Sequence, residues 1–467
     1  MSTNENKGKK AEVTALQAIS AEDRKDWISL AFVQAGICVC VPAFLLGALL
    51  AEAMPIWPAI ISGSLGYLIV VVGMVATGMI GCDLGLASCT CCQAGFGKSG
   101  ARFIVSTIFA VNMIGWFGIQ NGVCGEAFSN AMLAMTGWDI PVVVSNTIWG
   151  IIMLLTAVYG VHALEKLDKI SIPLLMIIMC YGIFLAFKVY GTGNLNDEGT
   201  VQSMSFMSGV ALSFNFTAVG TITGPDYTRF QKSRKDTVKS VFYGVFPMGV
   251  ITLIMGIVLT KLSGQYDISM VLIEVGLPLL GIIALVISTW TTNSTNAYSA
   301  GLNIVMALKL KDNRRREATL ISGIVGIVLC DLGILGHVEG VLSLLSYVVC
   351  PVGGVILADY WVVGKGKAKN FRPQDGVNWA GVIAWALGAI ISYTLVKIEF
   401  VGIIIGFVIY LIAERFIPSA SRDNAENIAY IITKKRRQKN ERIKQTGHDR
   451  SIVRMCSAWY RWWRSTC

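Results

Sequence analysis

Charged residues are scarce in this chain of 467 amino acids, because Asp, Glu, Lys and Arg together make up only 15% of it. A water-soluble protein carries about 25%. Hydrophobic residues account for 54%, and twelve stretches are long enough to cross a bilayer, each crossing needing about 20 mostly apolar residues. The scarcity of charge therefore excludes an ordinary soluble domain and predicts an all-α polytopic membrane protein.

The predicted membrane domain covers residues 28–417, between a polar N-terminal segment, 1–27, and a basic tail, 418–467. No cleavable signal peptide is expected, because the first apolar segment is too long for one. The twelve predicted segments lie near 28–51, 57–80, 103–135, 141–160, 170–190, 204–223, 240–262, 273–308, 318–336, 340–358, 377–396 and 400–417.

Positive charge is missing from alternate connections between these segments. Lys and Arg gather in the loops after segments six, eight and ten, whereas the intervening loops carry only Lys397. This alternation follows the positive-inside rule and predicts that both termini are cytoplasmic. It also explains the net charge of +10 without a nucleic-acid partner. We expect a monomer, surrounded by lipid, in the inner (plasma) membrane.

Catalytic motifs are also missing. The sequence has three histidines, His162, His337 and His448, and contains no zinc-protease, nucleophile-elbow or phosphate-binding motif. Its 12 cysteines indicate no disulfide framework, because they lie in or beside membrane segments or in a reducing cytoplasmic tail. We therefore expect neither an enzyme nor an organic cofactor; a membrane enzyme or sensor is kept as a remote alternative.

What the chain does contain is an uncharged polar stretch, Trp290 to Asn296, in the middle of segment eight. Hydroxyl and amide groups at mid-membrane depth are costly unless they face protein, water or a ligand. The stretch therefore predicts the lining of a binding site made of neutral oxygens and amides. For Thr291 and Thr292 the alternative is a hydrogen bond back to their own helix.

Helix-breaking residues recur five segments apart. Segment one contains Gly36 and Pro42, and segment six contains Gly220, Gly224 and Pro225. Both residue types interrupt helices. The pairing indicates an inverted repeat of five helices, with broken helices around a site at the membrane midplane. The alternative is that Gly and Pro are simply common in membrane helices.

Segment three supplies a candidate binding surface for a flat ligand. Trp116 and Gln120 are four residues apart, so they share a helix face. An indole can stack on a heterocycle at roughly 1–3 kcal/mol, and an amide both donates and accepts hydrogen bonds. Phe214 or Phe216 of segment six offers a second aromatic wall. The alternative for these residues is ordinary helix packing.

Four motifs occur in order along segments three to ten: Gly115–Gly118, Gly220–Phe230, Trp290–Asn293 with Tyr298–Gly301, and Pro351–Tyr360. Together they resemble the nucleobase–cation symporter-1 family, and within it the bacterial cytosine permeases. The resemblance implies a LeuT-type fold of 12 transmembrane helices, with segments 1–5 and 6–10 as inverted repeats and two extra helices. It also implies symport of a nucleobase, cytosine in first place, with a cation, commonly Na⁺.

The resemblance also implies roles for residues, matched by position. The expected substrate-binding residues are Trp116, Gln120, Phe216 and Asn293. The expected Na⁺ ligands are the carbonyls of Gly36, Val39 and Ser288 and the hydroxyls of Thr291 and Thr292.

The chain departs from the cytosine permeases at a few positions. Met113 stands where they carry a glutamine, and Gln120 instead follows the tryptophan by four residues, as in relatives that carry hydantoins. Ala218 replaces a serine, and Pro225 looks like an insertion. Purine, uracil, hydantoin and allantoin therefore remain alternative substrates. Proton coupling through Glu126 or Asp331 remains an alternative to Na⁺.

Overall fold

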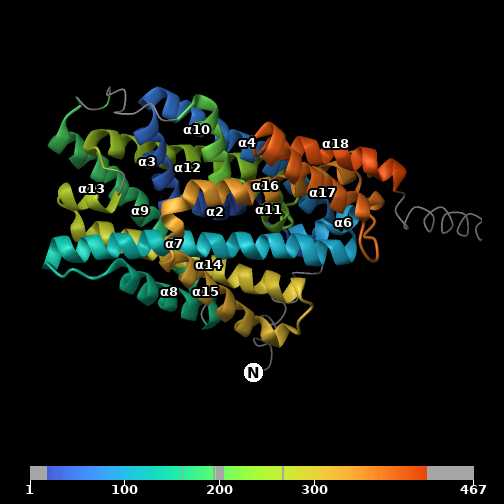
Figure 1. The fold of residues 1–467 in the computed structure, drawn as a ribbon, viewed down its shortest axis with the longest axis horizontal. Helices are drawn as coiled ribbons and strands as arrows, with labels where there is room; N and C mark the ends of the chain where they lie inside the picture. Colours follow the sequence, from blue (N-terminus) through green and yellow to red (C-terminus); the bar gives the residue numbers. More distant parts are fainter. Residues whose placement is uncertain (1–17, 160, 193–194, 196–203, 266–267, 418–467) are drawn as a thin grey trace, which may run out of the picture. The chain divides into compact units, whose positions relative to one another are not determined.

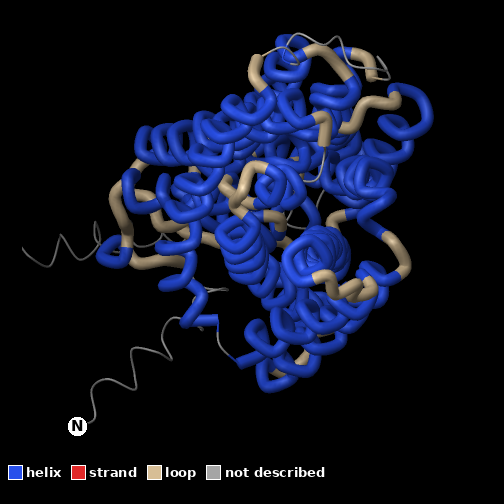
Figure 2. The backbone as a smooth tube through the Cα atoms, turned by 90° about the vertical axis from the view of Figure 1, so that its left-hand side faces the viewer, coloured by secondary structure: helices blue, strands red, loops and turns tan. Residues whose placement is uncertain are grey.

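The computed structural model of the chain describes residues 18–159, 161–192, 195, 204–265 and 268–417. Within these ranges the backbone is almost entirely helical, as Figure 2 shows, and the only β-type pairing is an isolated bridge between Lys25 and Gln231. The predicted tail, from residue 418, and the first 17 residues lie outside the described part of the chain.

The helices follow the apolar segments expected from the sequence. In the first half they are α2 (Trp27–Cys38), α3 (Val41–Ala53), α4 (Ile56–Leu84), α5 (Ser88–Cys91), α6 (Gln93–Gly100), α7 (Ser106–Thr136), α8 (Val142–Tyr159) and α9 (Val161–Tyr190). In the second half they are α10 (Phe206–Thr217), α11 (Gly220–Thr228), α12 (Arg234–Ser263), α13 (Ile268–Glu274), α14 (Pro278–Ala307), α15 (Arg315–Asp331), α16 (Val338–Leu357), α17 (Trp379–Ile391) and α18 (Val401–Phe416). Short π-helical stretches, η2 (Ala101–Val105), η6 (Ala358–Val363) and η8 (Ser392–Val396), continue or precede the long helices.

Each of the twelve predicted segments overlaps at least one of these helices. Among the described residues, seven helices are long and apolar enough to cross a membrane, or eight if the bent pair α2 and α3 is one span. Helices outside that set include α14, which is long but carries the polar stretch Trp290–Asn296, α15, which begins with charged residues, and the short α18. The structure thus confirms an all-helical membrane chain, and the number twelve remains a prediction.

Segment one is broken, as Gly36 and Pro42 predicted. Helix α2 ends at Cys38, α3 begins at Val41, and the two are bent by 54°. Val39 and Cys40 between them have non-helical backbone angles. Pro42 explains the break, since it lies in the first turn of α3 and has no N–H with which to continue the preceding helix. The last carbonyls of α2 consequently lack donors within their own helix.

Segment six is interrupted far less than we expected. The gap between α10 and α11 is only Ala218 and Val219, both with helical backbone angles, and the pair is not bent beyond 40°. Pro225 lies inside α11 and cannot donate to the carbonyl of Thr221. The hydroxyl of Thr77 on α4 donates to that carbonyl instead, at 2.8 Å. A hydrogen bond from a neighbouring helix thus compensates for the proline.

The helices form three packed groups. Helices α2, α3, α4, α10, α11 and α12 pack together, α7 packs with α8, α14 and α15, and α16 packs with α17 and α18. Figure 1 shows the second group together in the lower part of the view. Close approach within the first group requires small residues: a Cβ on Gly224 of α11 would lie 2.6 Å from the carbonyl oxygen of Met74 on α4.

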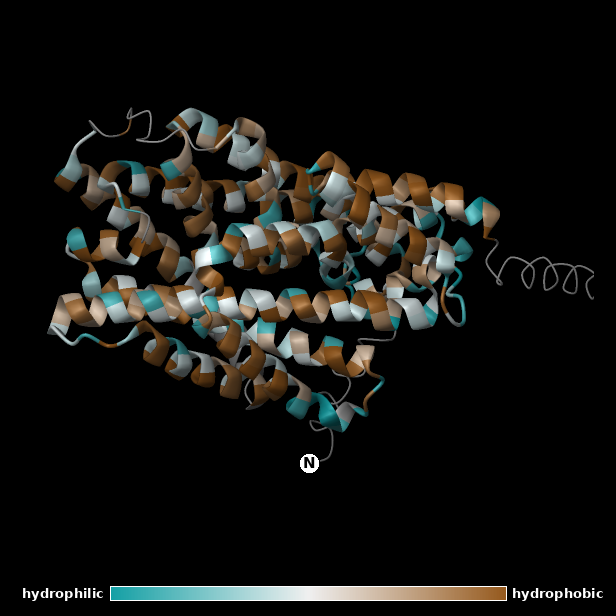
Figure 3. Cartoon of the chain, in the orientation of Figure 1, coloured by the Kyte–Doolittle hydropathy of each residue, from teal (hydrophilic) through white to brown (hydrophobic). Residues whose placement is uncertain are grey.

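Hydrophobic residues occur along most of the helices, as the brown ribbon of Figure 3 shows, and many large ones are exposed. Phe32, Leu395 and Phe416 are each at least 75% exposed. In a water-soluble protein such extensive apolar exposure would promote aggregation. Here it fits helices whose outer faces contact lipid.

Candidate substrate and cation site

The two predicted aromatic walls meet where the first and second helix groups face each other. Trp116 of α7 and Phe216 of α10 have ring centroids 5.9 Å apart and an interplanar angle of 68°. This is an edge-to-face contact between two buried rings. A ligand ring stacked between parallel walls needs about 7 Å, twice the carbon–carbon contact distance of about 3.5 Å. A ligand sandwiched here therefore requires one ring to turn or move aside.

Gln120 lies one turn after Trp116 on α7 and is buried. Its Oε1 has no hydrogen-bond partner among the described residues. An unpaired buried acceptor costs about 1–3 kcal/mol. The amide therefore offers a ready acceptor beside the indole for a ligand that donates a hydrogen bond.

Asn293 is fixed by the protein itself. Its Nδ2 donates to the carbonyl oxygen of Phe117 at 3.0 Å, which ties α14 to α7 next to Trp116. Asn296 donates to Asn293 Oδ1 at 3.3 Å. The structure therefore places Asn293 beside the aromatic pair but gives both ends of its amide a protein partner. Its contact with a ligand remains a prediction.

The expected cation ligands of segment eight come together in one helical turn. The hydroxyls of Thr291 and Thr292 each donate to the carbonyl oxygen of Ser288, at 3.0 Å. The helix-internal bonding considered as an alternative is thus present. Each hydroxyl oxygen nevertheless keeps lone pairs, because donating a hydrogen bond does not use them.

The break in segment one borders the same region. Val39 belongs to a hydrophobic cluster with Leu285, which lies one turn before Ser288. Gly36 lies in the last turn of α2, whose carbonyls lack helical partners. No group of three or more His, Cys, Asp or Glu that could hold a metal occurs among the described residues. The available ligands are thus neutral oxygens, a donor set that suits Na⁺ in transporters with broken helices.

A network of charged and aromatic residues closes the basic end of the helices, and sequence reasoning did not find it. Arg234 at the start of α12 donates to both carboxylate oxygens of Asp83 at the end of α4, at 2.9 and 2.5 Å. The hydroxyl of Tyr360 donates to Asp83 at 2.5 Å. The guanidinium also lies 4.9 Å from the ring of Trp361. We call these four residues the basic-end network.

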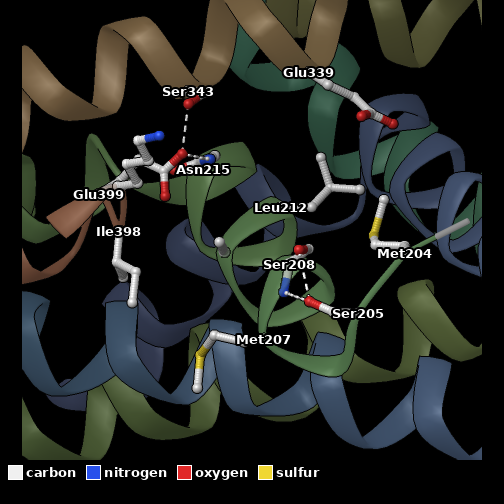
Figure 4. A pocket seen from close by; sticks show the side chains of 12 residues that line it. Met204, Ser205, Met207, Ser208, Leu212, Asn215, Glu339, Ser343, Ile398 and Glu399 are labelled. Carbon is white, nitrogen blue, oxygen red and sulfur yellow. Dashed lines mark hydrogen bonds between the residues drawn. The ribbon is translucent and has the colours of Figure 1, made fainter. Parts of the chain in front are cut away.

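A second feature that the sequence did not reveal is a cavity of about 360 Å³. It is lined by residues of α10, by Glu339 and Ser343 of α16, and by the loop 397–399 before α18 (Figure 4). Glu399, the only buried acid in its lining, follows a short loop and was not considered among the intramembrane acids. Its place directly before the apolar segment 400–417 was the one available signal.

The comparisons with known proteins decide the family. The sequence profile of a family described as permease for cytosine/purines, uracil, thiamine, allantoin matches residues 19–414. The chain belongs to this permease family. Cytosine permease of Escherichia coli (strain K12) is 29% identical over 389 residues, which cover 82% of this chain and 89% of that protein. Allantoin permease of Bacillus subtilis (strain 168) is 24% identical over 455 residues, covering 86% and 92%.

The fold of the permease is also known from solved structures. A nucleobase-cation-symport-1 family transporter, in a closed conformation with bromovinylhydantoin bound, superposes with a TM-score of 0.73 and 18% identity. The match covers 86% of this chain and 95% of that transporter. The permease is therefore a membrane transporter of the nucleobase permease family and not an enzyme.

Proposed function

We propose that this permease imports a nucleobase, cytosine in first place, together with Na⁺ by alternating access. The observation that carries the proposal is the buried pair of Trp116 and Phe216, with the unpaired Oε1 of Gln120 one turn away. An aromatic face and a hydrogen-bonding amide are what a flat heterocycle requires. Their place between two packed helix groups allows the site to open when the groups move.

The packing supports a fold of twelve helices with two inverted repeats of five. The first helix group contains predicted segments one, two, six and seven, and the second contains three, four, eight and nine. Members of each group thus correspond at a spacing of five segments, as an inverted repeat requires. The proposed topology is one membrane domain, 28–417, in the inner membrane, with cytoplasmic termini. We expect a monomer surrounded by lipid.

Sodium coupling is supported by the neutral oxygens around the break. Na⁺ bound by the carbonyls of Gly36, Val39 and Ser288 would hold segment one against segment eight. The hydroxyls of Thr291 and Thr292 complete the proposed ligand set. Binding there favours whichever form brings the two helices together, so the ion shifts the population toward that form.

Proton coupling is the second candidate, and one observation favours it. Asp331 at the end of α15 accepts a hydrogen bond from Thr147 at 3.3 Å through Oδ2. Its Oδ1 is buried and has no partner among the described residues. A carboxylate with a hydrogen-bond donor on only one of its two oxygens is a candidate proton acceptor. Ion-replacement uptake assays separate the two forms of coupling.

The role of the aromatic pair is tested by Trp116→Ala in the purified full-length permease. We expect cytosine binding to weaken by about tenfold to a hundredfold, because stacking contributes roughly 1–3 kcal/mol. Isothermal calorimetry with cytosine, uracil, adenine, allantoin and hydantoin, with and without Na⁺, measures the change. Trp57→Ala, which removes an exposed tryptophan at the start of α4, is the matched control. Wild-type affinity in Trp116→Ala would contradict the stacking role.

A further inference from the structure

The Glu399 cavity lies beyond the aromatic pair, at the end of the helices whose loops carry a single basic residue, Lys397, which is itself one of the lining residues. Leu212 on its wall belongs to the same hydrophobic cluster as Trp116 and Phe216. Asn215, another lining residue, directly precedes Phe216 in α10. The cavity therefore borders, through Leu212, the hydrophobic cluster that contains the proposed central site.

Glu399 forms the polar side of this cavity. It is only 6% exposed, and its Oε1 accepts hydrogen bonds from Asn215 Nδ2 at 3.0 Å and Ser343 Oγ at 2.5 Å (Figure 4). Both partners are neutral, and no salt bridge to Glu399 is found in the described ranges. A buried carboxylate is costly unless its oxygens are satisfied. The bonds it accepts from described residues all reach Oε1, so Oε2 keeps its capacity for a donor.

A second acceptor is unpaired in the same wall. Asn215 is 6% exposed, and its Oδ1 has no hydrogen-bond partner in the described part of the chain. Its Nδ2 is held by Glu399, which fixes the direction of the amide. Glu399 Oε2 and Asn215 Oδ1, on two side chains that are joined by a hydrogen bond, therefore both lack donors among the described residues. A ligand that satisfies them must donate hydrogen bonds.

The volume of the cavity favours a ring-shaped ligand over a single ion. About 360 Å³ falls in the range of small-molecule pockets, roughly 300–1,000 Å³. A bare cation would be surrounded by one coordination shell and needs far less space. Met207, Leu212 and Ile398 supply apolar surface around the polar side. This combination fits a flat ring whose one edge carries N–H groups.

We propose that the cavity is an outer subsite that captures the N–H edge of the heterocyclic substrate, through Glu399 and Asn215, before the substrate reaches Trp116. The proposal rests on the proposed function, since it assigns a second contact to the same substrate. Aminopyrimidines, which present ring N–H and amino donors, are the class that fits best. Substrates without N–H donors cannot form hydrogen bonds with these two oxygens, so the subsite does not bind them.

The test compares Glu399→Gln with wild type in proteoliposomes, using initial uptake of radiolabelled cytosine. Gln keeps the size of the side chain but removes the charge and replaces one acceptor oxygen by a donor. We expect kcat/KM to fall about tenfold or more, because hydrogen bonds to a charged group are lost. The maximal rate should stay unchanged, because the subsite acts before the central step. Glu399→Asp, which retains the carboxylate, should recover part of the loss.

Asp139→Asn is the matched control, since it removes an exposed carboxylate from the loop 136–140, which lacks basic residues and does not line the cavity. An equal loss in Asp139→Asn would show a long-range charge effect and overturn the subsite. A change in the Na⁺ concentration for half-maximal uptake, with KM for cytosine unaltered, would also overturn it. The melting temperature of each variant must match that of wild type. A wild-type kcat/KM in Glu399→Gln would refute the subsite and leave the proposed function standing. Absence of cytosine uptake by the wild-type permease would overturn both proposals.

Discussion

Two carboxylates at opposite ends of the helices have contrasting surroundings. Asp83, at the basic end, receives a guanidinium and a phenol and joins α4 to α12 and to η6. Glu399, at the other end, receives only neutral donors and borders a cavity of about 360 Å³. The first carboxylate is paired with a fixed charge and holds helices together. The second retains acceptor capacity, which is what a binding group needs.

The two ends of the permease also differ in the contacts that cross them. Contacts from Arg234 to Asp83 and to the carbonyl of Gly366 close the basic end, and no comparable ion pair crosses the described cavity at the other end. A transporter that works by alternating access must open its closed end and close its open end in each transport cycle. The described residues thus place a network of ionic and aromatic contacts at the basic end and a cavity at the opposite one.

Among the changes that test this contrast, the largest effect is expected from breaking the basic-end network with Arg234→Gln. Charge-assisted hydrogen bonds contribute about 1.5–3 kcal/mol each, and partial exposure of this pair reduces that value. We expect the basic end to open about tenfold more often. Cys82, buried beside Asp83, is a native reporter of opening, because we expect a maleimide to reach it faster when the network separates.

Peptide mapping by mass spectrometry measures the labelling rate of Cys82 separately from the other cysteines. Lys235→Gln is the matched control, because it removes an exposed positive charge from the next position of α12. Its labelling rate should equal that of wild type. If Arg234→Gln also leaves the rate unchanged, the network does not close the basic end and the contrast between the two ends fails.

A smaller effect is expected from Thr77→Val, which removes the donor to the Thr221 carbonyl. Interhelical hydrogen bonds in membranes contribute about 0.6 kcal/mol on average. Thermal unfolding in detergent should therefore show a small loss of stability. Thr77→Ser retains the hydroxyl and should preserve it. Destabilisation by Ser but not by Val would show that the methyl group matters instead, and that Pro225 needs no compensation.

The sequence allowed correct prediction where one residue decides the local structure. Pro42 interrupts segment one by its own covalent geometry, and the structure shows the break two residues earlier. In segment six the same logic overestimated the break, because Thr77 on another helix supplies the missing hydrogen bond. Partners from distant parts of the chain are invisible to a local pattern.

The candidate site shows the same difference between what a local sequence pattern predicts and what tertiary contacts determine. Trp116 and Phe216 were expected to be neighbours, and their rings do touch. The amide of Asn293 donates to the carbonyl oxygen of Phe117. This hydrogen bond depends on how closely α14 and α7 pack, which the sequence alone does not reveal. Glu399 was overlooked because only the packing of α10 and α16 around a short loop makes it a buried group. Residue type predicted the chemistry, whereas tertiary contacts decided which groups remain available.

The central claim is that a Na⁺ gradient drives nucleobase import through the site beside Trp116. Uptake of radiolabelled cytosine into proteoliposomes, with an imposed inward Na⁺ gradient at equal pH on both sides, tests it directly. We predict accumulation above the external concentration, abolished when Na⁺ is equal on both sides or replaced by K⁺. Accumulation that follows a pH gradient and ignores Na⁺ would contradict the claim.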